Sequence, residues 1–239
     1  MSDHTSKAFD SDLQELARMV AEMGGLAEKL ISDSIDALAR RDTGLAQRVT
    51  AADAQIDALQ RDIEQKAILT IARRQPMAVD LREIVGALRI ANDIERIGDL
   101  AKNIAKRVIA LNGDFPPPKL IRGVEHMSDL VLGQLKSVLD AYARRDDAKA
   151  MAVWRGDEQI DAMCTSVFRE LLTYMIEDPR NITFGIHLMF CAKNVERMGD
   201  HATNIAETVH YIVGGEAITE RRPKGEDTTF AISQFAAER

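Results

Sequence analysis

The sequence is poor in aromatic residues, proline and cysteine. Aromatic residues make up 5% of the 239 residues and apolar residues of all kinds 46%, so a core must be built mainly from Leu, Ile, Val, Ala and Met. The two cysteines, Cys164 and Cys191, form no CxxC pair. Isolated cysteines of this kind do not indicate a disulfide framework or a thiolate metal site, and they predict buried, reduced thiols in a cytosolic protein.

The chain also lacks an excess of basic charge. Its net charge of −7 and its pI near 5.3 argue against a nucleic-acid-binding protein, which would normally carry a basic face. The compact basic cluster at 221–224 falls in a segment that we expect to be a tail. No basic and then apolar signal pattern opens the chain, and no apolar run approaches the roughly 18 residues of a membrane span. We therefore expect a soluble, cytoplasmic protein.

No segment alternates convincingly between apolar and polar residues with the period of a β-strand. Apolar residues instead recur at the three- and four-residue spacing of a helical face. Breaks fall at residues typical of turns, such as those around Asp42, Pro76 and Pro179. The pattern predicts an all-α protein with six long helices, which run approximately over Leu13–Leu38, Leu45–Ile71, Val79–Leu111, Leu120–Ala143, Ala148–Met175 and Thr183–Val213.

These six helices form two copies of a set of three. The stretch DALARRD, which begins at Asp36, recurs as DAYARRD 104 positions later. The pentads ERIGD and ERMGD, which begin at Glu95 and Glu196, are 101 positions apart. A period of this length indicates a duplicated domain, and short turns make neighbouring helices antiparallel. We therefore predict two tandem, sequence-related three-helix bundles, at 1–112 and 119–213, and a flexible tail at 214–239.

The third helix of each copy carries an apolar face and a polar face. In the first copy Glu95 and Asp99 are four residues apart on the polar face, where two like charges repel. The second copy repeats the pair as Glu196 and Asp200. Gly98 lies beside the apolar stripe, where a small residue permits close helix packing. A repulsion that occurs twice suggests that a cation relieves it.

The second helix of each copy supplies a matching acidic pair, Asp53 with Asp57 and Asp157 with Asp161. In an antiparallel hairpin centred on Pro76, Asp57 lies level with Glu95 and Asp53 with Asp99. The corresponding pairs of the second copy are level across a turn beside Pro179. Each copy thus places four carboxylates at similar height on adjacent helices, although their rotation is not fixed by the sequence.

Four carboxylates with amides nearby suit a hard cation such as Mg²⁺, Mn²⁺ or iron. The alternative is a solvated face that Arg96, Lys102 and Arg197 neutralise. His201 replaces Leu100 of the first copy, and it either adds a nitrogen ligand to the second site or is simply exposed. The Glu-x-x-His pattern of ferritin-like oxidases is missing, which argues against redox catalysis at a dimetal centre.

Other chemical motifs are largely missing. The sequence contains no Gly-rich phosphate loop, nucleophile elbow, HExxH motif or Cys/His metal spacing, and these absences favour a protein that is not an enzyme. The first hairpin, RRQPMAVDLR, is basic. We expect four of its residues to be exposed and available to a partner: Arg73, Arg74, Asp80 and Arg82.

Several motifs together resemble the PhoU family of phosphate-signalling proteins. They are MxxMGG in the first helix, RRQPMAVDLR, ERIGD, ERMGDHATNIAE, and LLTYMIEDPR at the second hairpin. The resemblance spans about Leu13 to Val213. It implies a cytoplasmic homodimer that acts as a negative regulator and couples the ATPase subunit of the Pst phosphate transporter to the PhoR sensor kinase.

The resemblance also implies metal binding through E(D)xxxD motifs. These match Glu95/Asp99 and Glu196/Asp200, and the pairs Asp53/Asp57 and Asp157/Asp161 have the same spacing, so the resemblance implies all eight as ligands of Mg, Mn, Fe or Zn ions. Two alternatives stay open. One is a metal-binding bundle with a storage or enzymatic role that uses the same carboxylates, and the other is an accessory protein of a different phosphate permease.

Overall fold

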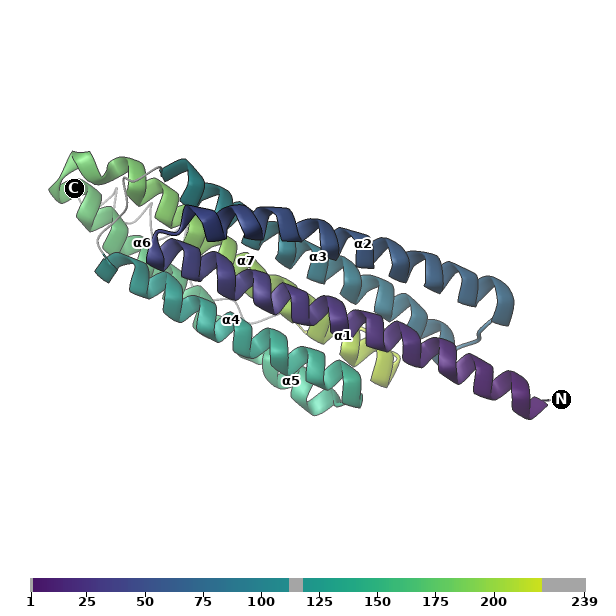
Figure 1. The fold of residues 1–239 in the computed structure, drawn as a ribbon. Helices are drawn as coiled ribbons and strands as arrows, with labels where there is room; N and C mark the ends of the chain where they lie inside the picture. The colour runs from purple at the N-terminus through teal and green to yellow at the C-terminus, as the bar shows by residue number, and fades with distance from the viewer. Residues whose placement is uncertain (1, 112–117, 221–239) are drawn as a thin grey trace.

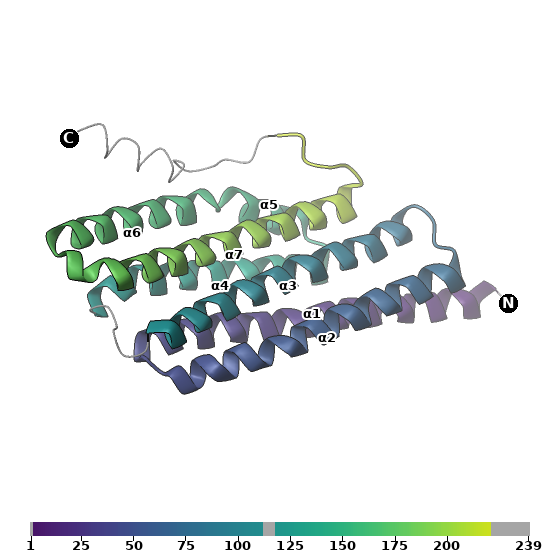
Figure 2. The same ribbon diagram turned by 90° about the horizontal axis from the view of Figure 1, so that it is seen from above.

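The computed structural model describes residues 2–111 and 118–220, and these residues form helices and turns without any strand. The first repeat consists of α1 (Ser2–Arg40), α2 (Thr43–Arg74) and α3 (Val79–Leu111). The second consists of α4 (Pro118–Arg144), α5 (Asp147–Arg155), α6 (Glu158–Glu177), the 3₁₀ turn η1 (Pro179–Asn181) and α7 (Ile182–Gly214). The predicted all-α fold of long helices is confirmed, and the two bundles lie side by side in an elongated molecule (Figures 1 and 2).

The repeated heptad DALARRD/DAYARRD forms the first turn of each bundle. Arg41 and Arg145 adopt left-handed backbone conformations, with φ of 60° and 52°. The next residue caps the following helix, because Asp42 accepts a 2.8 Å hydrogen bond from the Leu45 amide and Asp146 a 3.0 Å bond from the Lys149 amide. The duplication in sequence is therefore a duplication of one turn geometry.

The segment predicted as a single helix over Ala148–Met175 is two helices. The break lies at Gly156, whose counterpart in the uninterrupted α2 is Ala52. Glycine is a much weaker helix former than alanine, because its backbone loses more freedom when it is ordered. The Gly156 amide bonds to both the Ala152 and Val153 carbonyls, which tightens the end of α5.

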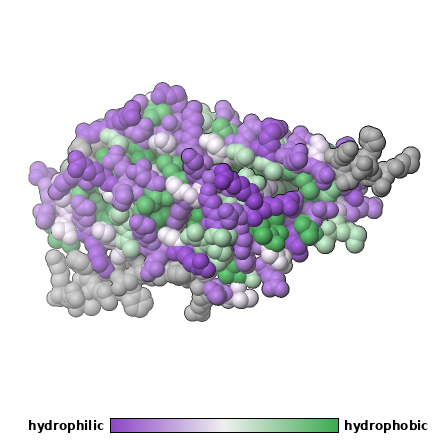
Figure 3. All heavy atoms as spheres, turned by 90° about the horizontal axis from the view of Figure 1, so that it is seen from below, coloured by the Kyte–Doolittle hydropathy of each residue, from purple (hydrophilic) through white to green (hydrophobic). Residues whose placement is uncertain are grey.

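Aliphatic side chains build the core, as the composition predicts. Leu16, Met23, Ile31, Ile56 and Ile90 are among the largest side chains that are fully buried. The two cysteines are free and buried, and burial raises the pKa of each thiol to about 12. Hydrophilic residues cover much of the surface, with apolar residues in separate patches between them (Figure 3).

Helices α3 and α7 pack against each other and join the two bundles. They run antiparallel along the middle of the molecule (Figure 2). Gly86 of α3 permits this approach, since a Cβ at that position would lie 2.4 Å from Cδ1 of Ile212. Among the described helices, none has the length and apolar character needed to cross a membrane. The linker between the bundles, expected at 112–118, lies outside the described residues except for Pro118, which begins α4, and residues 221–239 of the expected tail also lie outside them.

Candidate functional site

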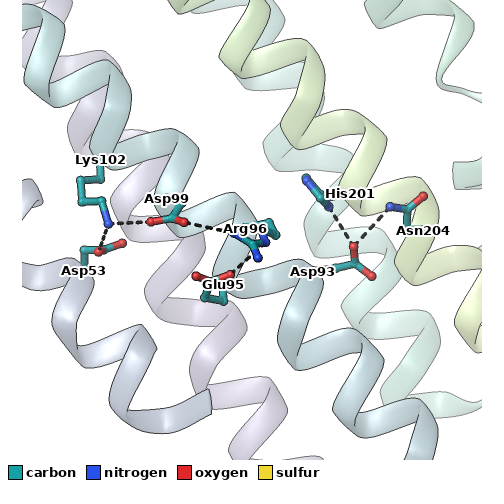
Figure 4. Close-up of polar contacts among 8 residues, drawn as sticks. All are labelled: Asp53, Asp93, Glu95, Arg96, Asp99, Lys102, His201 and Asn204. Carbon is teal, nitrogen blue, oxygen red and sulfur yellow. Dashed lines mark hydrogen bonds and ion pairs between the residues drawn. The ribbon is translucent and has the colours of Figure 1, made fainter. Parts of the chain in front are cut away.

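In the first repeat, the predicted acidic cluster surrounds a lysine. Lys102 of α3 donates hydrogen bonds to Asp53 of α2 at 2.5 Å and to Asp99 at 2.6 Å (Figure 4). Burial opposes the charge of this ammonium group, but the two hydrogen bonds outweigh burial and raise the pKa of Lys102. Asp53 is only 4% exposed, so its carboxylate depends on this partner.

Glu95, another carboxylate of this cluster, is less well compensated. Burial raises the pKa of Glu95, and the charges of Asp99 and Asp57 raise it further, while Arg96 lowers it. Oε2 of Glu95 has no hydrogen-bond partner, although Nε of Arg96 lies 3.4 Å away. The predicted register is therefore found, with Asp53 beside Asp99 and Asp57 beside Glu95. Arg96 and Lys102 form ion pairs with the acidic face of this repeat, as the alternative hypothesis predicts.

The register depends on close packing of α2 and α3. A Cβ on Gly98 would lie 2.9 Å from Cδ1 of Ile56, and a Cβ on Gly199 would lie 3.0 Å from Cδ1 of Ile160. Both glycines thus have the packing role that the sequence predicts for Gly98. They bring the acidic residues of the two helices within reach of each other in both repeats.

The second repeat places its carboxylates similarly but lacks the lysine. The counterpart of Lys102 is Thr203, whose hydroxyl lies 3.3 Å from Asp157 Oδ1 and 3.0 Å from the Gly199 carbonyl. Burial raises the pKa of Glu196. Lys193 lowers this pKa through a 2.7 Å hydrogen bond to Oε1 of Glu196. The negative charges of Asp200 and Asp161 raise it further. Oε2 of Glu196 is buried without a hydrogen-bond partner.

His201 takes neither of the two roles expected from the sequence. Its Nδ1 lies 2.8 Å from Oδ1 of Asp93 on α3, and the side-chain amide of Asn204 donates to the same oxygen at 3.3 Å (Figure 4). The imidazole therefore bonds across the seam between the repeats. Sequence reasoning missed Asp93, because the contact joins two copies that were treated separately. The available signal was the difference between the copies at this position, where the first has Leu100 and the second has the polar His201.

The comparisons with known proteins agree with the duplicated geometry. The model of the PhoU domain matches twice, at residues 20–108 and 124–209. The chain is 57% identical over 226 residues to a phosphate-specific transport system accessory protein PhoU homolog of Rhizobium meliloti, with 95% of each chain covered. The chain belongs to the PhoU family. A homolog with the same description in Caulobacter vibrioides is 52% identical over 94% of this chain and 97% of its own.

Solved structures of PhoU family members have the same fold. The crystal structure of PhoU from Pseudomonas aeruginosa superposes with a TM-score of 0.83 at 39% identity and covers 87% of this chain and 100% of its own. The regulatory protein PhoU of the phosphate transport system of Streptococcus pneumoniae gives a TM-score of 0.82 at 28% identity, covering 89% of this chain and 100% of its own. This chain and the two PhoU structures therefore share one fold.

The metal binding implied by the resemblance to the PhoU family would need several acidic side chains around one ion. Within residues 2–111 and 118–220, no three His, Cys, Asp or Glu side chains are placed to hold a metal ion together. In the first repeat, Lys102 supplies the positive charge between Asp53 and Asp99, so that repeat does not fit a metal ion as it stands. In the second repeat, Oε2 of Glu196 is buried without a hydrogen-bond partner, and no ammonium group stands at the position of Lys102.

The first hairpin exposes only part of its predicted basic surface. Arg73 is exposed, whereas Nη2 of Arg74 lies 3.0 Å from Oδ2 of Asp12. The guanidinium of Arg82 packs against Gly215 beyond the C-terminal end of α7. Asp80 is partly buried in the first turn of α3, where a carboxylate is favoured by the helix dipole. The large apolar residues exposed near this tip are Ile68, Leu69, Met77, Val79 and Leu81.

Proposed function

We propose that this chain is a cytoplasmic, inhibitory adaptor that regulates phosphate uptake and phosphate-starvation signalling. It contacts the ATPase subunit of the Pst transporter and the PhoR sensor kinase. The observation that carries the proposal is the 57% identity, over 95% of the chain, to a phosphate-specific transport system accessory protein. An adaptor acts through its surfaces, and the structure offers exposed apolar residues at a bundle tip.

The chemistry of the described residues supports an adaptor rather than an enzyme. Both thiols are buried and have pKa values raised to about 12, so neither is a ready nucleophile. The acidic side chains of the first repeat are held by Lys102 and Arg96. A group with a fixed, neutralising partner is poorly suited to exchange protons with a substrate.

Partner binding is assigned to the α2–α3 tip. Met77 is 80% exposed and Val79 47% exposed, beside the exposed Arg73. Exposed apolar side chains next to an arginine are typical of interfaces. A second copy of the chain is a further partner, since we propose that the protein is a homodimer.

The experiment combines a reporter with a pull-down. Deletion of the gene should switch on phosphate-starvation genes in phosphate-rich medium, and unchanged expression would contradict the regulatory role. Solubilised membranes should yield the transporter ATPase and the sensor kinase on wild-type bait, and less of at least one of them on a Met77→Ser, Val79→Ser, Leu81→Ser bait. The matching Ile176→Ser, Ile182→Ser bait at the other tip should retain the partner that the first variant loses. If the bait captured a different phosphate permease, that permease would replace the Pst transporter as the proposed partner.

A second candidate function is cation binding by the second repeat. We infer it from one specific difference, which is that Thr203 stands where the first repeat has Lys102. The ligands would come from Asp157, Asp161, Glu196 and Asp200, and the ion would be Mg, Mn, Fe or Zn. A bound ion would supply positive charge to these carboxylates, of which Asp157 is buried and the other three are partly buried. Elemental analysis of purified protein tests this assignment, and the absence of any of these metals after loading would contradict it.

A further inference from the structure

A cavity of about 350 Å³ lies where α1, α3, α4 and α7 meet. Two of these helices belong to each repeat, so the cavity lies in the seam between the bundles. Its apolar wall includes Leu13, Leu16, Ala17, Ala87 and Ile212. Its polar wall includes Asp10, Gln14, Glu83, Tyr142 and Arg145. Small-molecule sites have this size and this mixture of apolar walls with a few polar groups.

The duplicated fold supplies an internal comparison that explains why the cavity exists. At the opposite end of the seam, bulky apolar residues occupy four of the equivalent positions. Ala17, Ala87, Glu83 and Tyr142 line the cavity, and their counterparts are, in the same order, Ile121, Leu188, Phe184 and Leu38. These four counterparts are core residues with at most 6% exposure. One end of the seam is therefore packed with side chains, while the other has smaller and more polar residues.

The polar wall includes a positively charged side chain of the protein, the guanidinium of Arg145. Glu83 has a side chain that is 14% exposed, and it forms an ion pair with Nη2 of Arg145. Arg145 reaches it from the α4–α5 turn and is itself 62% exposed, so it approaches from the rim. A nearly buried carboxylate is thus compensated by a guanidinium that is free to leave towards solvent.

Tyr142 adds a hydrogen-bonding group beside this carboxylate. Burial raises its pKa to about 12, and the charge of Glu83 contributes to the rise. The phenol is therefore protonated at neutral pH. Asp10 and Gln14 of α1 complete the polar wall. The cavity contains two carboxylates and one guanidinium, and that guanidinium is already paired.

We propose that this cavity binds a small molecule that carries an ammonium group on a short apolar body. The ammonium group replaces Arg145 on Glu83, and the apolar body lies against Leu16, Ala87 and Ile212. An anion is disfavoured, because an anion that took Arg145 from Glu83 would leave the Glu83 carboxylate without a counter-charge and would also face Asp10. Such a ligand touches both repeats, so it gives the molecule a small-molecule input that is separate from the proposed contacts with protein partners.

The test uses three probes that share one apolar body. Hexylamine, hexanol and hexanoate are titrated into the full-length protein, with binding followed by calorimetry and by NMR. Hexylamine should bind most tightly and should raise the melting temperature. If hexanol bound as tightly as hexylamine, the cavity would recognise only the apolar body. If hexanoate bound more tightly than hexylamine, the cavity would be an anion site. Either result, or no binding of hexylamine, would overturn the proposal.

Two variants should act in opposite directions. Glu83→Gln should weaken hexylamine binding by about tenfold or more, because it removes a charge-assisted hydrogen bond. Arg145→Asn should tighten it, because the competing guanidinium is gone and asparagine tolerates the left-handed backbone at this position. Weaker binding to Arg145→Asn would mean that the arginine itself recognises the ligand, which contradicts the proposal.

A third variant fills the cavity with the residue found at the other end. Ala87→Leu introduces leucine, the residue type found at the counterpart position 188, and should abolish hexylamine binding. The matched control is Ala110→Leu, an exposed position on the same helix, which should leave binding unchanged. Circular dichroism reports whether each variant is folded. If Ala87→Leu does not fold, the opposite effects of the Glu83 and Arg145 variants still decide the question.

Discussion

At the scale of the residue, the two repeats differ most at one position of the acidic cluster. Lys102 holds Asp53 and Asp99 through two short hydrogen bonds, whereas its counterpart Thr203 contributes only a hydroxyl near Asp157. An ammonium group carried by the chain is always present, unlike an ion that must be taken from solution. The pair of Asp53 and Asp99 therefore has its counter-charge from the chain itself.

This difference predicts that the two repeats respond differently to metal. The double variant Glu196→Gln, Asp200→Asn should remove metal from the protein, while Glu95→Gln, Asp99→Asn should leave the metal content unchanged. Lys102→Thr should add a metal site to the first repeat and should lower the free energy of unfolding without metal by about 1.5–3 kcal/mol, because two charged hydrogen bonds are lost. Elemental analysis and thermal melts with Mn²⁺, Fe³⁺ or Mg²⁺ measure both effects. Equal metal loss in both double variants would contradict the asymmetry.

At the scale of the element, glycines decide where helices end and how closely they pack. Gly156 ends α5, and its φ of −77° is one that alanine also adopts. Gly86 lies inside α3 against α7, in a place where a Cβ would collide with Ile212. The same substitution should therefore have opposite effects at these two positions.

Gly156→Ala should raise the free energy of unfolding by about 0.4–1 kcal/mol, because alanine restricts the unfolded chain and its Cβ would meet no atom closer than 3.4 Å. Gly86→Ala should lower it by about 1–3 kcal/mol through overpacking. Chemical denaturation monitored by circular dichroism measures both values. Destabilisation by Gly156→Ala would show that the break between α5 and α6 is required by the bundle.

The pairing of α1 with α2 should depend on pH. Asp12 of α1 accepts hydrogen bonds from Lys66 at 2.8 Å and from Arg74 at 3.0 Å, and the bond from Lys66 is the main reason why the pKa of Asp12 is lowered. A lowered pKa adds stability above the pKa of the unfolded state, near 3.9, and this stability is lost as the pH falls through the folded value.

Asp12→Asn should therefore cost about 1 kcal/mol at pH 7. The difference from wild type should disappear as the pH falls well below 4. Urea denaturation at a series of pH values measures it. A difference that persists at pH 2 would assign the effect to packing rather than to charge.

At the scale of the whole molecule, the seam between α3 and α7 makes the two repeats depend on each other. Asp93 bonds to His201 and Asn204 across it, and Gly86 contacts Ile212. Separation of the repeats would expose these surfaces to water. Residues 1–112 expressed alone should therefore self-associate or melt without cooperativity, as measured by sedimentation velocity and circular dichroism. A stable monomer would show that the predicted domain boundaries mark independent units.

Much of this architecture could be predicted from the sequence because the duplication reveals it. The repeated motifs revealed the two bundles, and the position of Pro76 was enough to place Asp53 level with Asp99. The contact between His201 and Asp93 could not be predicted, because the packing of one copy on the other leaves no periodic signal. The position of Lys102 between two carboxylates depends on side-chain rotation, which helical spacing does not determine. The break at Gly156 was missed because apolar periodicity continues across it.

The antiparallel seam also sets the polarity of the molecule. The α2–α3 and α6–α7 hairpins lie at opposite ends (Figure 2), and α3 and α7 are each 33 residues, or about 50 Å, long. Both ends expose large apolar side chains, such as Met77 at one and Ile176 and Ile182 at the other. Two proteins bound at the two ends would not collide. A single copy of this elongated molecule can therefore act as a spacer that holds them a fixed distance apart.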